Sequence, residues 1–235
     1  LVLVAFFTLL LFFALSAVAQ RSTRGQRIAF SALGAALTVL VGVILISAYQ
    51  RLLLYEAVYG FSRLRTYTHV FMLWLGVLLV ALMLLELTNK LRSFALVSLL
   101  VALGFGVTLN LLPVDGLIAR QNVMQAQAGS ELDSAYLVSL SPDAVSSLWD
   151  MYSGTEVKAE VQAQIGGILA CQAAINPPEE LPWQSFNLAR AQAQRLFQAE
   201  KAELVQYDAR KDSSDLWVVT VNGQTLSCEG DFWTD

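Results

Sequence analysis

Four apolar runs, each long enough to cross a bilayer, dominate the first half of the chain and restrict what it can fold into. A membrane helix needs about 20 predominantly apolar residues. Such runs occur at residues 1–19, 28–49, 70–87 and 93–112. We therefore expect an all-α bundle of about four transmembrane helices. The first run ends in LSAVAQ, which also fits a signal-peptide cleavage site. Because Leu1 already lies inside this run, we expect further membrane segments before it.

Charge divides the sequence into two halves with opposite sign. The chain is 56% hydrophobic and only 14% charged, whereas charged residues make up about a quarter of a typical soluble domain. Residues 1–112 carry eight Lys or Arg and two acids, a net charge of +6, and residues 113–235 carry seven bases and seventeen acids, a net charge of −10. We predict a transmembrane domain over residues 1–112 and a soluble acidic domain over residues 113–235. The acidic balance argues against nucleic acid as a partner.

Basic residues in the short connectors predict the orientation, because Lys and Arg collect on the cytoplasmic side. Five bases lie in the connectors at residues 20–27 and 88–93, and three lie between residues 50 and 69. We expect the side with five bases to be cytoplasmic, which makes the C-terminal domain extracytoplasmic. The chain has two cysteines, Cys171 and Cys228, and both lie in that domain. They are expected to form a disulfide in an oxidising compartment, and two unpaired thiols are the alternative.

Small residues at four-residue spacing predict how the membrane helices pack. Such rows let helix backbones approach closely inside a bilayer. The second run carries Gly34, Thr38 and Gly42, and the fourth carries Ser98, Ala102, Gly106 and Asn110. We expect the second and fourth helices to pack through these rows, with the third helix facing more lipid.

The segment between the second and third runs, residues 51–69, is rich in aromatic and basic side chains. We expect an interfacial segment here, because Tyr and Arg suit the level of the lipid headgroups. If the segment were one helix, Tyr55, Tyr59, Arg63 and Tyr67 would lie on one slowly turning face. A sharper hypothesis is a site for lipid headgroups or another anionic ligand. Its candidate residues are Tyr55, Tyr59, Arg63, Arg65, Tyr67 and His69.

The C-terminal half predicts a small α+β domain. Asp115, Asp133 and Asp143 are expected to be helix caps, and the sequence Ser-Pro-Asp at residues 141–143 is a helix start. Two longer helical runs are separated by NPPEELP, which suggests a helical hairpin. The last segments, LVQYDA, DLWVVTV and QTLSCEG, are expected to form an antiparallel three-stranded sheet with Asn222 and Gly223 as a two-residue turn.

Three motifs in order resemble a known family. The first is Tyr, then Tyr-Gly and a later Arg, running into an apolar helix with a Trp, and the others are a Pro…Ile-Ala…Asn segment and an Asp…Tyr-Leu…Leu-Ser…Asp-Ala segment. The matching positions are Tyr55, Tyr59, Gly60, Arg65, Trp74, Pro113, Ile118, Ala119, Asn122, Asp133, Tyr136, Leu137, Leu140, Ser141, Asp143 and Ala144. Phe61, Ser62 and Leu112 depart from the pattern. Together the motifs resemble a bacterial multi-spanning membrane family, domain of unknown function 4173, which is related to the family numbered 4153. The resemblance implies a polytopic bacterial membrane protein and no particular activity.

The sequence offers no convincing catalytic constellation. Its single histidine, His69, has no nucleophile in its sequence context, and the two cysteines lack zinc-site spacing, so we expect no metal and no cofactor. The favoured hypothesis is a non-catalytic accessory, assembly or scaffold component of the bacterial envelope that presents its external domain to a protein partner. The alternative is a transporter or lipid-handling enzyme with its site at the outer interface, and a membrane sensor is third.

Overall fold

The computed structural model of the chain describes residues 24–88, 90–177, 184 and 186–228. The chain divides into two compact units. The membrane unit comprises residues 1–59 and 64–112, and the C-terminal unit comprises residues 60–63 and 113–235. The first predicted membrane run, residues 1–19, lies outside the described residues.

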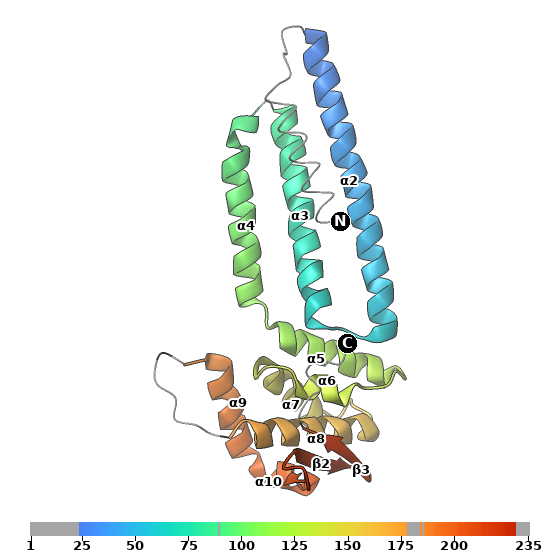
Figure 1. Ribbon diagram of the computed structural model, residues 1–235, viewed down its shortest axis with the longest axis vertical. Helices are drawn as coiled ribbons and strands as arrows, with labels where there is room; N and C mark the ends of the chain where they lie inside the picture. Colours follow the sequence, from blue (N-terminus) through green and yellow to red (C-terminus); the bar gives the residue numbers. More distant parts are fainter. Residues whose placement is uncertain (1–23, 89, 178–183, 185, 229–235) are drawn as a thin grey trace. The chain divides into compact units, whose positions relative to one another are not determined.

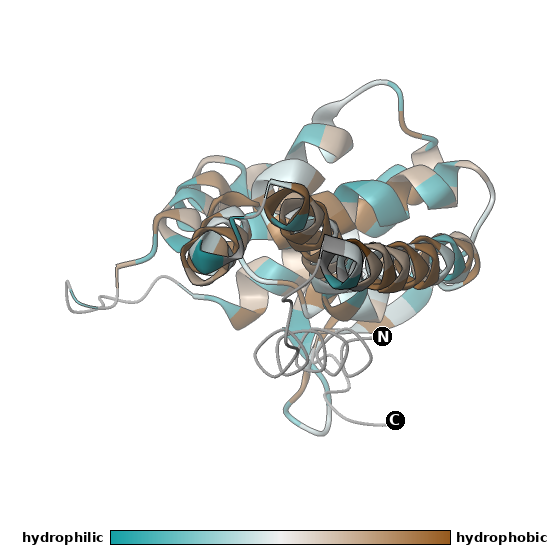
Figure 2. Cartoon of the chain, turned by 90° about the horizontal axis from the view of Figure 1, so that it is seen from above, coloured by the Kyte–Doolittle hydropathy of each residue, from teal (hydrophilic) through white to brown (hydrophobic). Residues whose placement is uncertain are grey.

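Three helices of the membrane unit are long and apolar enough to cross a bilayer, by length and composition, among the described residues. They are α2 (Arg24–Tyr59), α3 (Arg63–Leu87) and α4 (Phe94–Leu111), and the short 3-10 helix η1 (Leu91–Ser93) precedes α4. Apolar residues surround all three long helices (Figure 2). The expectation of apolar spans is confirmed for these three helices. The segment 51–69 differs from expectation, because α2 continues without a break to Tyr59 and α3 begins at Arg63.

Helix α3 lies between α2 and α4 in the membrane unit (Figure 1). Its contact with α2 is an apolar cluster made of Val41, Leu45, Met72, Leu75 and Leu79. Its contact with α4 includes an edge-to-face pair of Phe71 and Phe105, whose ring centroids are 6.1 Å apart. The predicted packing of the second helix against the fourth is therefore not what the structure has. A row of small residues shows where a helix can be approached closely, but it does not identify the neighbour.

The small residue that brings α3 and α4 together is Gly104. The indole ring of Trp74 lies directly where a Cβ atom at Gly104 would be. The same indole donates a hydrogen bond from Nε1 to Thr108 Oγ1 at 3.2 Å, one turn further along α4. By contrast, no described atom lies within 4 Å of a Cβ atom built on Gly42 or on Gly106, two members of the predicted rows.

Replacing Gly104 with alanine is expected to destabilise the membrane unit by about 1–3 kcal/mol, because the added methyl group would push Trp74 out of its place. Gly106→Ala is the matched control on the same helix. It meets open space, so it should be neutral or slightly stabilising. Thermal unfolding of both variants in detergent measures the difference, and equal melting temperatures would contradict the α3–α4 contact described above.

The C-terminal unit consists of helices packed on a small sheet. Its helices are α5 (Val114–Gln127), α6 (Ser134–Val138), α7 (Asp143–Ser153), α8 (Ala159–Ile175), α9 (Leu188–Ala199), α10 (Lys201–Leu204) and η3 (Val205–Tyr207). Helix α8 is central, because it packs on α6, on α7 and on the sheet. Two adjacent glycines allow this, since Gly166 lies against Tyr207 and Gly167 lies against Val221. Helix α9 packs on α7, so the predicted hairpin of two long helices is replaced by packing through α7.

The three-stranded antiparallel sheet is confirmed, and its order is β1 (Arg210–Lys211), β2 (Trp217–Val221), β3 (Gln224–Ser227). The turn between β2 and β3 uses Asn222 (φ 51°) and Gly223 (φ 80°), the left-handed pair that a tight hairpin turn requires. The first strand was expected at LVQYDA, which was wrong. That segment instead continues the helical path through η3, and Asp208, with φ 47°, ends it in a left-handed conformation before β1 begins.

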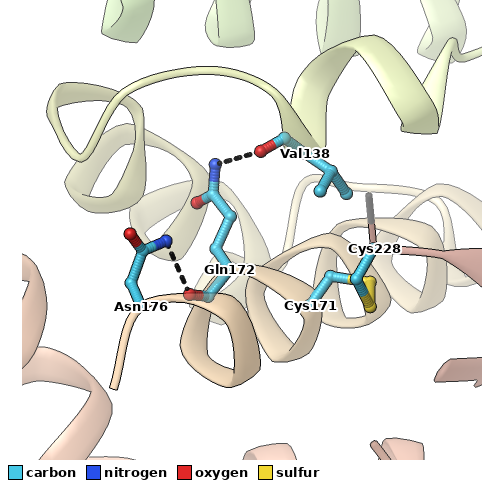
Figure 3. Close-up of a disulfide and its surroundings, with 5 residues drawn as sticks. All are labelled: Val138, Cys171, Gln172, Asn176 and Cys228. Atoms are coloured by element: carbon cyan, nitrogen blue, oxygen red, sulfur yellow. Dashed lines mark hydrogen bonds between the residues drawn. A yellow bond between two sulfur atoms is a disulfide. The ribbon is translucent and has the colours of Figure 1, made fainter. Parts of the chain in front are cut away.

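The predicted disulfide is present between Cys171 of α8 and Cys228, which follows β3 (Figure 3). Both cysteines are fully buried. Next to this bond, the buried Gln172 side chain donates to the backbone carbonyls of Leu137, Val138 and Leu140 at 3.2–3.4 Å. These carbonyls lie at the C-terminal end of α6, where a helix leaves acceptors without partners. One turn of α8 thus holds both the sheet and α6.

Removing the disulfide should lower the stability of the C-terminal unit by about 4 kcal/mol in the chain-entropy account, because the bond joins residues 57 positions apart. The experiment is urea unfolding of the full chain in detergent, comparing the wild type with the Cys171→Ala, Cys228→Ala double variant. In the control, a reductant without urea leaves the wild-type protein folded, since both sulfurs are buried. Equal unfolding midpoints for the two proteins would show that the bond adds no stability.

Candidate functional site

The six residues proposed as a ligand site do not form one cluster in the structure. The chain reverses direction at Gly60, whose φ of 74° ends α2. As a result, Arg63 enters a hydrogen-bond network of the C-terminal unit, His69 joins a buried pair in the membrane unit, and Tyr59 and Arg65 remain together at the surface. Tyr67 is 42% exposed, and within the described part of the chain no hydrogen bond or ring contact joins it to the other five.

The turn between α2 and α3 belongs to the C-terminal unit. Asn122 of α5 pairs with both backbone polar groups of Phe61. Its Oδ1 accepts from Phe61 N at 2.9 Å, and its Nδ2 donates to Phe61 O at 3.0 Å. Gly60 is required for this approach, because a Cβ atom there would collide with Asn122 Oδ1. The asparagine side chain carries both an acceptor and a donor, so it can pair with both backbone groups of one residue.

Arg63 fixes the other end of the turn through a bidentate ion pair with Asp115 of α5. The guanidinium donates from Nε to Oδ1 at 2.8 Å and from Nη2 to Oδ2 at 2.6 Å. Asp115 Oδ2 also accepts from Ser141 N at 2.7 Å, and the backbone N–H of Arg63 donates to the Tyr136 hydroxyl at 2.9 Å. We call the set Phe61, Arg63, Asp115, Asn122, Tyr136 and Ser141 the turn clasp.

The clasp perturbs the ionisation of Asp115. This residue is only 5% exposed, and burial by itself raises the pKa of the carboxyl group. The hydrogen bonds from Arg63 and Ser141, together with the charge of Arg63, outweigh burial, so the net pKa is lowered from its usual value. Asp115 does not serve as the predicted helix cap, because the N-cap residue of α5 is Pro113. The predicted cap at Asp133 is confirmed by its hydrogen bond from Tyr136 N.

His69 lies against Glu56 within the membrane unit. His69 Nε2 is 2.7 Å from Glu56 Oε2, and Glu56 is 1% exposed. The Tyr49 ring meets the imidazole edge to face at 4.8 Å. This pair bridges the last turns of α2 and the second turn of α3. The sequence analysis did not assign Glu56 a partner. Glu56 and His69 lie 13 residues apart, on either side of Gly60.

The remaining candidates form an exposed aromatic and basic surface. Tyr55 and Tyr59 stack with ring centroids 6.1 Å apart, and the Arg65 guanidinium lies 5.9 Å from the centre of the Tyr59 ring. The two tyrosines are 58% and 69% exposed. Of the original six residues, only these three stay together as a possible surface for a ligand.

Each unit also contains a groove among its described residues. In the membrane unit an apolar groove of about 770 Å³ runs along α2 and α3, with Tyr49 and His69 among its lining residues. In the C-terminal unit a smaller groove of about 340 Å³ lies between α8, α10 and β2. Within the described residues no group of three or more His, Cys, Asp or Glu side chains could hold a metal ion.

A family model described as domain of unknown function (DUF4153) matches residues 1–151. The chain belongs to this family. DUF4153 is the family that the sequence motifs indicated as the relative of family 4173, and membership of family 4173 itself is not shown. The comparison with curated proteins and the comparison with solved structures each gave no match. The matched range contains the whole turn clasp but neither cysteine.

The family motifs acquire a physical meaning in the clasp. Gly60, Asn122, Tyr136 and Ser141, which come from all three motifs, meet around the turn. The arginine in this network is Arg63, although the motif alignment pointed to Arg65. The sequence reasoning also missed Asp115 as its partner, because a partner 52 residues away leaves no local pattern.

Replacing Asp115 with asparagine is expected to lower the free energy of unfolding by about 1–3 kcal/mol at pH 7, since a charge-assisted pair with a partly exposed arginine is lost. A lowered pKa in the folded state means that this stabilisation is present above the ordinary carboxyl value of about 3.9. It is lost as the pH falls through the folded-state value. The difference between the wild type and the variant should therefore shrink on acidification below about pH 4.

Denaturant unfolding from pH 3 to pH 7 measures this difference. Asp143→Asn is the matched control, because Asp143 also lies in the first turn of a helix but is exposed and outside the clasp. The same pH dependence in both variants would show that the Arg63–Asp115 pair does not carry the effect.

Proposed function

We propose that this chain is a non-catalytic accessory or scaffold protein of a bacterial cell membrane, and that it holds its C-terminal unit on the extracytoplasmic side for binding to a protein partner. The turn clasp is the observation that carries this proposal. The turn between two apolar helices is itself a folded part of the C-terminal unit. A folded unit built in this way suits a component that presents one surface to a partner.

Two observations support the extracytoplasmic side. The Cys171–Cys228 bond lies in the C-terminal unit, and disulfides persist in oxidising compartments. The segments around the start of α2 and just before α4 are the more basic ones, as cytoplasmic segments are. Their basic residues are Arg21, Arg24, Arg27, Lys90 and Arg92. The α2–α3 turn and the end of α4, which lead directly into the C-terminal unit, lie at the opposite ends of these helices.

The groove of the C-terminal unit is the surface that we assign to the partner. Its lining residues include Ala170, Ala173 and Ala174 of α8, together with Val205 and Trp217. Val205 is 66% exposed, and Lys201 and Asp208 line the same groove. A lining of small side chains with one aromatic ring and one charge of each sign suits an apolar side chain of a peptide segment, flanked by polar groups.

The transporter or lipid-handling alternative draws less support from the geometry. It requires the six candidate residues to line one cavity, but Arg63 is engaged by Asp115 and His69 by Glu56. A sensor that binds a small ligand would use the same C-terminal groove, so partner identity decides between that reading and the scaffold.

A single experiment tests both orientation and partner binding. Cysteine is introduced at Val205 in the groove or, as a control, at Glu160, which is exposed in the first turn of α8. Intact cells are treated with a membrane-impermeant maleimide that carries a photo-crosslinker and are then irradiated. We expect both cysteines to be labelled and only the Val205→Cys protein to give one discrete adduct with a second protein, which also co-purifies with the unmodified chain.

Labelling of neither cysteine until the cells are permeabilised would overturn the orientation. Labelling of both without an adduct specific to Val205→Cys would overturn the partner surface and favour a ligand-binding sensor.

A further inference from the structure

We propose that the membrane unit holds a binding site for a small monovalent cation such as Na⁺, with Glu86 of α3 and Thr38 of α2 as its ligands. The two residues line one small cavity between α2 and α3, together with Gly34. This inference concerns the membrane unit and is independent of the proposed scaffold function. Glu86, Thr38 and their cavity are called the cation site below.

Glu86 is a buried carboxylate at the end of a helix that is apolar enough to cross a bilayer. It lies one residue before the end of α3 and is 9% exposed. Its Oε2 is enclosed, and no hydrogen bond reaches that atom from the residues that the structure describes. Lys90, four residues further on, is exposed, and no ion pair of the described residues includes Glu86. A buried charge without a partner is costly, and an ionisable group inside a membrane span indicates a functional site.

The hydroxyl group of Thr38 has no proton to offer this carboxylate. It donates its single proton to the backbone carbonyl of Gly34, one turn earlier in α2, at 2.9 Å. The oxygen of Thr38 therefore keeps only lone pairs for a further contact, and an ionised carboxylate also offers lone pairs alone. Two acceptors that line one cavity require a species that both can bind, which is a hydrogen-bond donor or a cation.

Size and charge select among such species. The cavity has a volume of about 10 Å³, which is near the minimum for one water molecule, so the side chain of a partner helix does not fit. A water molecule would bridge the two oxygens but would leave the charge of the carboxylate uncompensated. A divalent ion such as Ca²⁺ takes about six to eight oxygen ligands, and the described residues hold no acidic cluster that could supply them. A small monovalent cation satisfies both the size and the charge.

The position of the site predicts what cation binding does. The apolar cluster described above packs α2 on α3 around Val41 and Leu75. Beyond this cluster, the cation site lies in the first turns of the apolar part of α2, at Gly34 and Thr38, and in the last turn of α3. A bound cation would join the two helices there, and a ligand that binds the folded state raises the free energy of unfolding.

The test is thermal unfolding of the full chain in detergent, in sodium chloride or in choline chloride at equal ionic strength and pH. Choline is too large for a cavity of about 10 Å³. For the wild type we expect a melting temperature about 3–6 °C higher in Na⁺ at about ten times the Kd obtained by titration. Glu86→Gln keeps the shape of the side chain and removes its charge, so it should abolish this shift. In choline the variant should melt above the wild type, because an uncompensated buried charge is removed.

Three further variants serve as controls. Thr38→Ser keeps the hydroxyl ligand and should retain the shift, whereas Thr38→Val removes the ligand and should lose most of it. Glu160→Gln removes an exposed acid of α8 and should respond to Na⁺ as the wild type does.

Equal melting temperatures of the wild type in sodium and in choline would overturn the site. An equal shift in the wild type and in Glu86→Gln would show a general effect of the sodium salt and would overturn it as well. Should Glu86→Gln fail to fold, the two Thr38 variants decide, and equal shifts in both would contradict the proposal.

Discussion

The ion pair between Arg63 and Asp115 is the interaction on which the organisation of the chain depends. A carboxylate that is 5% exposed is costly to bury unless a cation and hydrogen-bond donors surround it. The cation comes from the first residue of α3, far away in sequence. The C-terminal unit is therefore completed by four residues that lie between two membrane helices. The polypeptide passes between the units at three places, residues 59–60, 63–64 and 112–113.

The sequence predicts features that depend on local pattern. The apolar runs predict α2, α3 and α4, because the length and hydropathy of a membrane helix are local properties. Asn222 and Gly223 predict the hairpin turn, because a positive φ at two successive residues is a local requirement. Asp133 predicts a helix cap for the same reason. The strand expected at LVQYDA failed because η3 continues the helical path of α10, and Asp208 then ends it in a left-handed conformation.

Features that depend on contacts between residues far apart in the sequence could be predicted only in part. The disulfide was predicted because only one pair of cysteines exists. The partners of Arg63 and His69 were not predicted. Asp115 had a simpler explanation as a helix cap, and nothing in the local sequence assigned a role to Glu56. The packing of α4 failed for a related reason. Its small residues occupy two faces, and the face with Gly104, which was not in the predicted row, is the one that meets Trp74.

The break at Gly60 explains why one motif yields two kinds of surface. Had the helix continued, Tyr55, Tyr59, Arg63 and Tyr67 would share a face, and Arg63 would add its charge to the tyrosines. The left-handed turn instead gives the segment after residue 60 a new helix axis. Arg63 can then pair with a buried carboxylate while Arg65, two residues on, lies over the Tyr59 ring. A residue with a Cβ atom at position 60 would collide with Asn122, so the hydrogen bonds of Asn122 require glycine at this turn. The motif resembles a ligand site in sequence because anchoring a turn requires the same residue types, arginine and tyrosine, that a ligand site would use.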